Sequence, residues 1–370
     1  MKINTITCHH SYNHGAMLQA YALAHYLQSL GHDVSIIDYK ARYMSNYKIN
    51  FKWVPKKYNH IGIRNLYLLL KKKHYIMTQM RHDSLESFYN EHMPITSLQY
   101  RSIEQLKENP PEGDLYIAGS DQIWNTSFPN GTDPAFYLDF GTPKRKISYA
   151  ASFATTELRD GTQDFVREKL SNFDAISVRE HSAITILESL GYKGDVVVDP
   201  VLLLNQKEWD KLLKQETGEG EDYILTYDFE HRDSPLGVIA KRLARLYGCK
   251  IYSVSSHKRR YEDKSFFACS PEDFISMIKH ARCVVSNSFH GTVFSMIYGK
   301  DFFVVNRKDG LNERMHDLLD HYGLQERLVS PDTSDDTLMR SIDYDRIKNS
   351  VTKDIDFSKS FLQHQIELAQ

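Results

Sequence analysis

The feature that most constrains this chain is the regular alternation of short apolar runs with helix-like segments. In the first half, the runs predicted to be strands are 2–8, 34–39, 115–118, 147–152, 175–178 and 196–198. The helices predicted between them include 16–30, 161–173 and 182–190. Strands that alternate with helices in this way favour a parallel sheet covered by helices.

A second set of the same kind follows a polar stretch. Its predicted strands are 223–227, 250–254, 283–286 and 302–305, and its predicted helices are 236–247, 271–280, 292–298 and 312–321. A chain of 370 residues is also longer than one hydrophobic core usually serves. We therefore predict an α/β protein of two doubly wound, Rossmann-like domains that face a cleft, with the chemistry at the carboxyl ends of the strands.

The polar stretch sets the predicted boundaries. We assign 1–203 to an N-terminal domain, 204–222 to a linker, 223–340 to a C-terminal domain and 341–370 to a helical tail. No signal peptide and no apolar run near the ~18 residues that span a bilayer is seen, so we expect a cytoplasmic protein.

Metal binding is not predicted. The four cysteines are far apart and form no C-x-x-C pair, so neither a disulfide framework nor a cysteine zinc site is expected. His9, His10 and His14 can be read as ligands, but no carboxylate partner or fixed zinc spacing accompanies them.

The net charge of −2 conceals one strongly basic segment. Residues 40–81 hold eleven Lys and Arg and no acid, whereas the rest of the chain holds 35 basic and 48 acidic residues. With its aromatic residues and the apolar run 66–70 before Lys71-Lys72-Lys73, the segment suits contact with an anionic membrane surface. A solvated loop that offsets the acidic body fits it nearly as well. Nucleic acid binding is not expected, because the rest of the protein is acidic.

Polar residues follow the predicted strands. The first strand leads through Asn13 to Gly15, where backbone amides at a helix start can approach an anion, although such turns are often merely geometric. After 115–118 comes Asp121, which suits either a helix cap or a general base. Arg179 ends another strand, and its guanidinium suits a carboxylate or phosphate, or a surface pair with Glu180. Asp199 is assigned a structural capping role.

The strongest run is Ser286-Asn287-Ser288-Phe289-His290-Gly291, which follows a hydrophobic strand. Asn287 and Ser288 can donate hydrogen bonds to an anion at the helix start, and His290 can donate or shuttle a proton near neutral pH. A capping histidine is the simpler alternative. Downstream, Arg314 can reach the same cleft.

Together these runs resemble the polysaccharide pyruvyltransferase family from about residue 2 to residue 327. The matching stretches are Asn13-His-Gly-Ala-Met-Leu-Gln-Ala-Tyr-Ala-Leu, Gly119-Ser-Asp-Gln-Ile-Trp-Asn, Ser177-Val-Arg-Glu, Val198-Asp-Pro-Val-Leu, Ser286-Asn-Ser-Phe-His-Gly-Thr, and Arg314 with 318–319 and 323–324. The resemblance implies a bacterial enzyme of the glycosyltransferase B type. Such an enzyme moves the pyruvyl group of phosphoenolpyruvate onto a hydroxyl pair of a sugar, in capsule or surface polysaccharide synthesis. Phosphoenolpyruvate is then a co-substrate, no cofactor is needed, and the acceptor can be a lipid-diphosphate-linked oligosaccharide.

The resemblance and the chemistry assign roles to the residues. We expect His290 and Asp121 to be catalytic. The expected donor-binding residues are Arg179, Asn287, Ser288 and Arg314, and the expected acceptor or loop residues are Asn13, Gly15, Gln19, Gln122 and Trp124. Some relatives carry Arg where this chain has Ser288, which makes Arg314 or a lysine a candidate to neutralise the donor.

Two other functions remain open from the sequence. A nucleotide-sugar glycosyltransferase would need an acidic residue to grip a ribose, and Asp228 and Glu230 are candidates. A non-enzymatic glycan-binding protein would not need polar side chains at the ends of so many strands.

Overall fold

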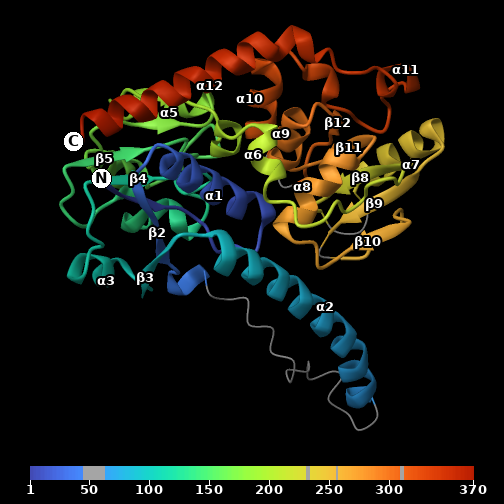
Figure 1. Cartoon of the computed structure of the whole chain (residues 1–370), viewed down its shortest axis with the longest axis horizontal. Coiled ribbons are helices and arrows are strands. Elements are labelled where there is room, and N and C mark those ends of the chain that lie inside the picture. Colours follow the sequence, from blue (N-terminus) through green and yellow to red (C-terminus); the bar gives the residue numbers. More distant parts are fainter. Residues whose placement is uncertain (45–62, 231–233, 256, 309–311) are drawn as a thin grey trace.

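Two five-stranded sheets form the framework of the protein (Figure 1). The structure is a computed structural model that describes residues 1–44, 63–230, 234–255, 257–308 and 312–370, without the side chains of residues 66, 69–71, 73 and 74. The first sheet has the order β3-β2-β1-β4-β5, and its strands are β1 (Lys2–Ile6), β2 (Asp33–Tyr39), β3 (Ile95–Tyr100), β4 (Leu115–Ala118) and β5 (Arg145–Ser148). Neighbouring strands are parallel throughout.

The second sheet is also parallel and has the order β10-β9-β8-β11-β12. Its strands are β8 (Tyr223–Tyr227), β9 (Lys250–Val254), β10 (Lys264–Phe266), β11 (Cys283–Ser286) and β12 (Asp301–Val304). A short parallel pair, β6 (Ser177–Val178) and β7 (Asp195–Val196), continues the first sheet beyond β5 through isolated bridges.

The strand order reverses at the centre of each sheet, between β1 and β4 in the first and between β8 and β11 in the second. In open parallel sheets, ligands bind outside the carboxyl ends of the strands at such a reversal. The predicted fold of two doubly wound, Rossmann-like domains with a glycosyltransferase B-like arrangement is confirmed. Each sheet therefore offers one crevice, and both crevices open toward the domain boundary.

Seven of the helices that connect the strands lie close to predicted positions. They are α1 (His14–Ser29), α4 (Gln163–Leu170), α5 (Ser182–Ser189), α7 (Leu236–Tyr247), α8 (Pro271–His280), α9 (Phe289–Ile297) and α10 (Glu313–His321). The short helices α3 (Ile103–Glu108), α6 (Gln206–Asp210) and α11 (Asp335–Leu338) were not predicted. The sequence did not predict the edge strands β3 and β10. The apolar pattern misses them because β3 is largely exposed and β10 has only three residues.

Helix α1 links the two domains. It is buried along most of its length, and one apolar cluster joins it to α8, α9, the short 3₁₀ turn η5 (Pro200–Leu203) and strands of both sheets. The wholly buried Trp209 donates its indole N–H to the Val201 carbonyl and packs edge-on against Phe294, with ring centroids 4.9 Å apart. The domains are therefore joined by a shared core on this side.

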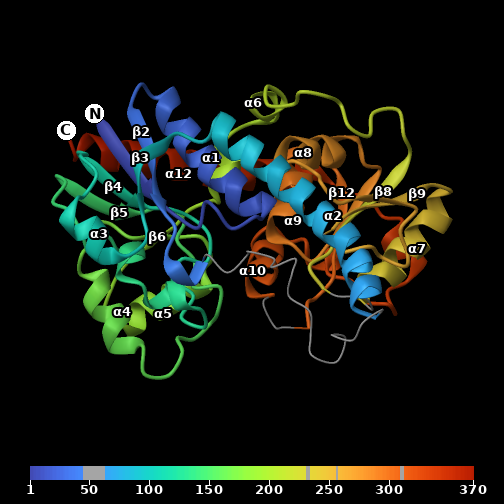
Figure 2. The ribbon, with the colours of Figure 1, turned by 90° about the horizontal axis from the view of Figure 1, so that it is seen from below.

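The long helix α12 (Tyr344–Glu367) crosses from the second domain to the first (Figures 1 and 2). At its start the Tyr344 hydroxyl donates to the Lys300 carbonyl at 2.7 Å. Farther along, Ser358 Oγ accepts a hydrogen bond from the amide of Val198 at 2.9 Å. The predicted helical tail thus spans both domains on the face opposite α2.

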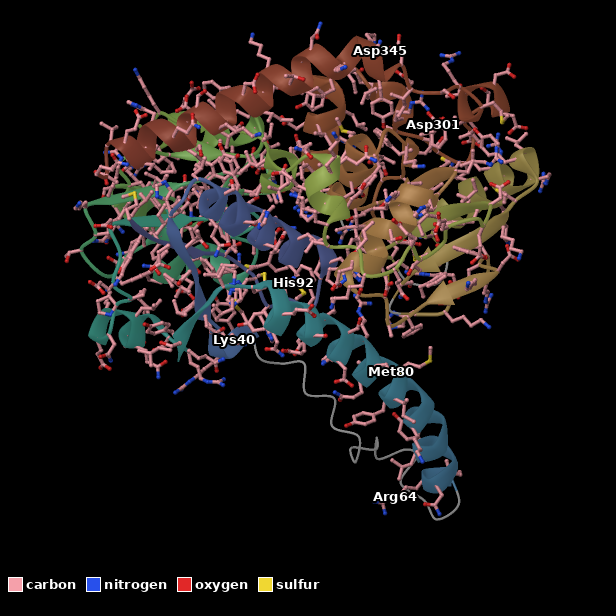
Figure 3. The ribbon with its side chains drawn as sticks, in the orientation of Figure 1. Lys40, Arg64, Met80, His92, Asp301 and Asp345 are labelled. Atoms are coloured by element: carbon pink, nitrogen blue, oxygen red, sulfur yellow. The ribbon has the colours of Figure 1, made fainter. Side chains whose placement is uncertain are left out.

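Helix α2 (Ile63–His92) holds the second half of the basic segment and was not predicted as a helix. Its C-terminal part packs on the first domain through buried Leu85 and Phe88, whereas the part that includes Arg64 extends away from the body (Figure 3). Residues 45–62, and the side chains of Lys71, Lys73 and part of the run 66–70, lie outside the described residues. Within the described part of the chain, no helix combines the length and apolarity needed to cross a membrane.

Candidate active site

The first turns of α1 and α9 meet at the domain boundary. Asn13 caps α1 and Ser288 caps α9, each accepting hydrogen bonds from backbone amides of the first turn. Between these caps the ring of His290 lies directly on Gly15, where a Cβ would come within 2.1 Å of His290 Nδ1. A glycine is required at position 15 because any side chain would occupy the space of the imidazole.

The buried carboxylate of Asp199 connects both domains beneath this contact. One of its oxygens, Oδ2, accepts hydrogen bonds from Nη1 of Arg179 at 2.6 Å and from the hydroxyl of Ser120 at 3.1 Å. The same oxygen lies 3.5 Å from Nε2 of His290. The other oxygen, Oδ1, caps the amide of Val201 at 3.1 Å. Asp199 therefore has the predicted capping role, but it also contacts Arg179, which the sequence assigned to donor binding, and His290, which the sequence assigned to catalysis.

Charges compensate one another at this point. Burial alone would raise the pKa of Asp199, but His290 and Arg179 hold it well below its usual range, so the carboxyl is ionised. Burial alone would lower the pKa of Arg179, but the charges of Asp199 and Glu180 outweigh burial and raise it above its usual value, so the guanidinium is charged. An arginine and a carboxylate buried together need this mutual compensation, because either ion alone is costly in an apolar interior.

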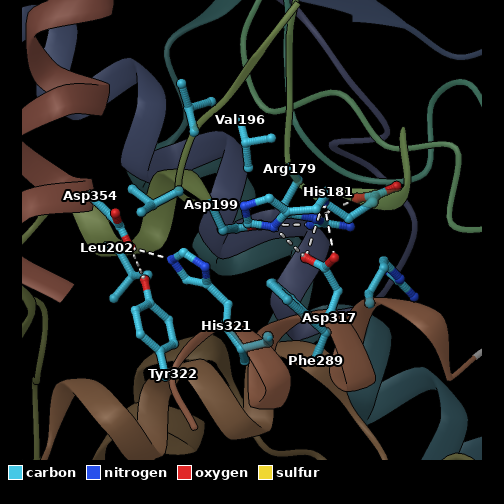
Figure 4. A pocket seen from close by; sticks show the side chains of 15 residues that line it. Arg179, His181, Val196, Asp199, Leu202, Phe289, Asp317, His321, Tyr322 and Asp354 are labelled. Atoms are coloured by element: carbon cyan, nitrogen blue, oxygen red, sulfur yellow. Dashed lines mark hydrogen bonds and ion pairs between the residues drawn. The ribbon is translucent and has the colours of Figure 1, made fainter. Parts of the chain in front are cut away.

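One edge of the Arg179 guanidinium is left unused. Its Nε and Nη2 are buried and have no hydrogen-bond partner among the described residues. These two atoms form the edge that grips a carboxylate or phosphate bidentately. Arg179 lines a cavity of about 80 Å³ together with Glu180, Asp199 and Phe289 (Figure 4). The Phe289 ring packs on the guanidinium, with its centroid 4.5 Å away, and leaves the hydrogen-bonding edge unpaired.

Arg314 brings a second cation from α10. Its Nη1 lies 3.8 Å from Oδ1 of Asp121, and its guanidinium stands 5.9 Å from the centre of the Phe289 ring. Burial, followed by the charge of Arg179, lowers the pKa of Arg314 to about 10, which still leaves it cationic at neutral pH. Asp121 has a positive φ of 79°, a conformation that is strained for a residue with a side chain and that often marks functional positions.

A larger cleft of about 450 Å³ lies between the domains and shares Phe289 and Arg314 with the small cavity. The predicted site residues that line it are Asn13, Asp121, Gln122, Asn287, Ser288, His290 and Arg314. The small cavity has room for an anion of a few heavy atoms, and the cleft has room for a sugar. The fold thus brings together the ends of β1, β4 and β11, as predicted from the strand-end motifs.

Other predicted residues lie elsewhere. Trp124 is wholly buried, donates its indole N–H to the Phe136 carbonyl and stacks on Tyr137, so the structure does not bring it to the cleft. Gln19 is wholly buried under the first loop, where it donates to Thr7. Both side chains support the loops that carry site residues instead of lining the cleft.

Asn287 serves mainly to join two strand ends. Its amide donates to Asp228 at 2.7 Å and accepts from the amide of Phe229 at 2.9 Å. Ser288 accepts a hydrogen bond from the amide of Gly291, so its own hydroxyl hydrogen can still be donated into the cleft.

The sequence interpretation missed Glu180 and Phe289 as parts of the site and gave Asp199 only a capping role. Glu180 and Asp199 each follow a short strand, as Asp121 does, and this shared position is the one signal that could have marked them. Phe289 gave no such signal, because an aromatic residue in the first turn of a helix usually belongs to the core.

The N-terminal histidines are engaged within the protein. His14 is buried between the domains, with Nδ1 at 3.2 Å from the hydroxyl of Tyr227 and Nε2 at 2.9 Å from the carbonyl of Cys269. Burial lowers the pKa of His14 to about 3, so the ring is neutral. His9 contacts Asp38, and His10 contacts Glu86. Among the described residues, no three His, Cys, Asp or Glu side chains are grouped as metal ligands would be.

Comparison with known families identifies the class of protein that this fold and site define. The family model for polysaccharide pyruvyl transferase matches residues 13–309, which include the Asn13 cap, Asp121, Arg179, Asp199 and His290. The chain belongs to the polysaccharide pyruvyl transferase family. It is therefore a transferase with a role in polysaccharide biosynthesis. The comparison with curated proteins gave no match.

Three solved structures with a similar fold are distant from this chain in sequence. SnogD, a glycosyltransferase from Streptomyces nogalater, is 11% identical with a TM-score of 0.47, over 100% of this chain and 99% of that one. UGT89C1 from Arabidopsis thaliana is 10% identical with a TM-score of 0.48, over 100% and 99%. The UDP-GlcNAc 2-epimerase from Neisseria meningitidis is 12% identical with a TM-score of 0.44, over 100% and 94%.

The contact between Gly15 and His290 leads to a first prediction. Gly15→Ala should lower the free energy of unfolding by roughly 1–3 kcal/mol, the usual cost of overpacking a filled site. In the His290→Ala background the same substitution should cost much less, because the ring that it meets is gone. Urea denaturation of the four proteins measures this coupling. An equal cost in both backgrounds would show that the two residues do not touch.

Proposed function

We propose that the protein transfers the pyruvyl group of phosphoenolpyruvate onto a hydroxyl pair of a sugar, forming a pyruvate ketal in bacterial capsule or surface polysaccharide synthesis. The observation that carries this proposal is the unused bidentate edge of Arg179, fixed by Asp199 beside His290. A small molecule that bears both a carboxylate and a phosphate suits a site with two guanidinium groups. The family membership supports the same activity.

The donor would lie between the cations of the two domains. Arg179 offers its free edge from the first domain, and Arg314 offers its guanidinium from the second. The hydroxyl of Ser288 and the first turn of α9 add hydrogen-bond donors near the same point. Arg314 thus supplies the charge that some relatives draw from an arginine in place of Ser288.

The chemistry requires an acid and a base on opposite sides of the donor. Protonation of the enol carbon makes the adjacent carbon electrophilic, and a sugar hydroxyl attacks it while losing its proton. Phosphate then leaves, and the second hydroxyl closes the ketal ring. His290, whose Nε2 has no hydrogen-bond partner in the described part of the chain, is the proposed acid. Asp121, in the wall of the larger cleft, is the proposed base.

The acceptor would enter from the first domain. Asn13 and Gln122 line the larger cleft on that side, beside Asp121. A second cavity of about 660 Å³ adjoins the cleft at Ser11 and Phe128 and is rich in aromatic and histidine side chains. Aromatic rings pack on the apolar faces of sugars, so this cavity suits the sugars next to the one that reacts.

A nucleotide-sugar glycosyltransferase fits the site less well. Asp228 is one of the two candidates for gripping a ribose, with Glu230, but its oxygens already accept hydrogen bonds from Asn287, the amide of Glu230 and the hydroxyl of Tyr261. It is also almost fully buried. A ribose would have to displace these partners.

The donor proposal predicts selective stabilisation. Phosphoenolpyruvate should raise the melting temperature and UDP-sugars should not. A ligand that binds only the folded state adds about 2.7 kcal/mol to the free energy of unfolding when its concentration is a hundred times its Kd. In Arg179→Lys, the same rise in melting temperature should require at least ten times more phosphoenolpyruvate, because lysine has no bidentate edge. Arg167→Lys, a change at an exposed arginine, is the matched control. Stabilisation by UDP-sugars alone would reject the proposal.

Measurements of turnover and of donor binding should distinguish the roles of the two proposed catalytic residues. His290→Ala and Asp121→Asn should each lower turnover by roughly 10²–10⁴-fold, the usual contribution of a positioned acid or base. Asp121→Asn should leave the affinity for phosphoenolpyruvate nearly unchanged, because the proposal places Asp121 on the acceptor side. Steady-state kinetics and calorimetric titration measure the two effects. Loss of donor binding in Asp121→Asn would move this residue to the donor site.

We also propose that the basic segment 40–81 contacts the inner face of an anionic membrane and so meets a lipid-diphosphate-linked acceptor. The described part of α2 supports this, because its N-terminal part extends away from the body and carries the exposed side chains of Ile63, Arg64, Lys72, Ile76 and Met80 (Figure 3). Each cation near an anionic surface contributes about 1 kcal/mol.

This contact should be visible as salt-sensitive binding to anionic vesicles. Changing Lys71, Lys72 and Lys73 to Glu should abolish co-sedimentation yet leave activity on a short soluble acceptor intact. The control changes the exposed lysines Lys241, Lys348 and Lys353 to Glu, which alters the net charge equally. Wild-type protein that stays in the supernatant at low salt would contradict the proposal.

A further inference from the structure

The side chain of Glu180 has one oxygen without a partner. Glu180 follows Arg179 at the end of β6, and only 2% of its side chain is exposed. Its Oε1 accepts hydrogen bonds from the hydroxyl of Ser152 at 2.7 Å and the amide of Ala154 at 2.9 Å. Its Oε2 has no hydrogen-bond partner among the described residues, and Nε of Arg179 lies 3.9 Å away. An oxygen buried in this way is costly unless a ligand or a proton satisfies it.

This oxygen stands beside the unused edge of Arg179. Glu180 and Arg179 line the same small cavity, and Nε belongs to the edge that would grip an oxyanion. An anion bound on that edge would bring a second negatively charged oxygen close to Oε2. Two oxyanions in contact repel strongly in a buried site, unless a proton lies between them.

The charges around the cavity point the same way. The guanidinium groups of Arg179 and Arg314 face the carboxyls of Asp199, Asp121 and Glu180, so a multiply charged anion would enter a site with no excess of positive charge. His290 lies beyond Asp199, and His181 is paired with Asp317 at 3.2 Å in the wall of the cavity. Asp199 lies beside His290 and Arg179, which favour its ionised form.

Glu180 is the carboxyl best suited to hold a proton. Burial raises the pKa of Glu180, and the opposing effects of Arg179, the Ala154 amide, the Ser152 hydroxyl and Arg314 do not cancel this rise. The proton would sit on Oε2, because Oε1 already accepts two hydrogen bonds.

We propose that Glu180 is protonated when an anion occupies the Arg179 site and that it donates this proton to the anion as a hydrogen bond. The proton comes from solvent and no covalent bond between heavy atoms is made or broken. Glu180 therefore makes anion binding proton-linked and favours ligands that present an acceptor oxygen to it. The inference rests on the proposed function only in taking Arg179 as an anion site.

Titration calorimetry in buffers of different ionisation enthalpy tests the inference by counting the protons taken up on binding. The wild type and Glu180→Gln are titrated with phosphoenolpyruvate, so that the ligand's own ionisation cancels in the difference. Between the pKa of Glu180 in the free protein and its higher pKa in the complex, the wild type should take up as much as one proton more than Glu180→Gln, and its affinity should fall relative to the variant by up to tenfold per pH unit. Glu188→Gln, at an exposed glutamate of α5, should behave as the wild type.

Infrared difference spectroscopy provides an independent measurement that does not need Glu180→Gln to fold. The spectrum of the wild type bound to phosphoenolpyruvate should contain the carbonyl band of a protonated carboxylic acid. Binding with equal proton uptake in both proteins and no such band would overturn the inference and leave the proposed function standing. Binding of inorganic phosphate but not of phosphoenolpyruvate, with the extra proton, would leave the inference standing and reject the proposed function. If neither anion binds, both fail.

Discussion

The structure of the site depends on one buried carboxylate. One oxygen of Asp199 accepts a hydrogen bond from Nη1 of Arg179, and the other caps η5. His290 of the other domain lies against the same carboxylate. Removing either charged partner would leave an uncompensated ion in an apolar interior, which typically costs several kcal/mol. The carboxylate therefore fixes which edge of the guanidinium is held and which remains for a ligand.

Close packing between the two domains also constrains the site. The imidazole of His290 fills the space above Gly15, so α1 and α9 can approach with their first turns together. A shared apolar core around α1, α8, α9 and Trp209 keeps the two sheets in this relation, and α12 crosses both domains on the opposite face from α2. Packing at some distance from the charged groups thus fixes how the two domains meet, while Asp199 fixes the orientation of Arg179 within the site.

The two proposed substrates would bind in two adjoining cavities of different size. The small one contains buried, charged and partly unsatisfied groups, of which Arg179 and Glu180 are the clearest. The larger one is lined by hydroxyl, amide and aromatic groups that suit a sugar, together with the charged or titratable side chains of Asp121, His290, Arg307 and Arg314. Phe289 and Arg314 belong to both walls, so they lie where the two substrates would meet. A transferase needs such a meeting point, because the donor carbon and the acceptor hydroxyl must come into contact while water stays outside.

Local pattern determined much of the fold. Strands β4, β8, β9 and β11 and helices α7 and α8 lie at the predicted positions, because a buried parallel strand is a short apolar run and a covering helix has its own period and caps. The placement of Asp121, Arg179 and His290 at strand ends followed from the same pattern. The edge strands β3 and β10 and the helix α2 escaped it, since exposed elements lack an apolar signature. What only the tertiary structure decided was how these ends are paired. Asp199 pairs with Arg179 and His290, the imidazole of His290 packs on Gly15, and Trp124 lies in the core. Each of these outcomes depends on contacts between segments far apart in the chain, whose distances no local pattern contains.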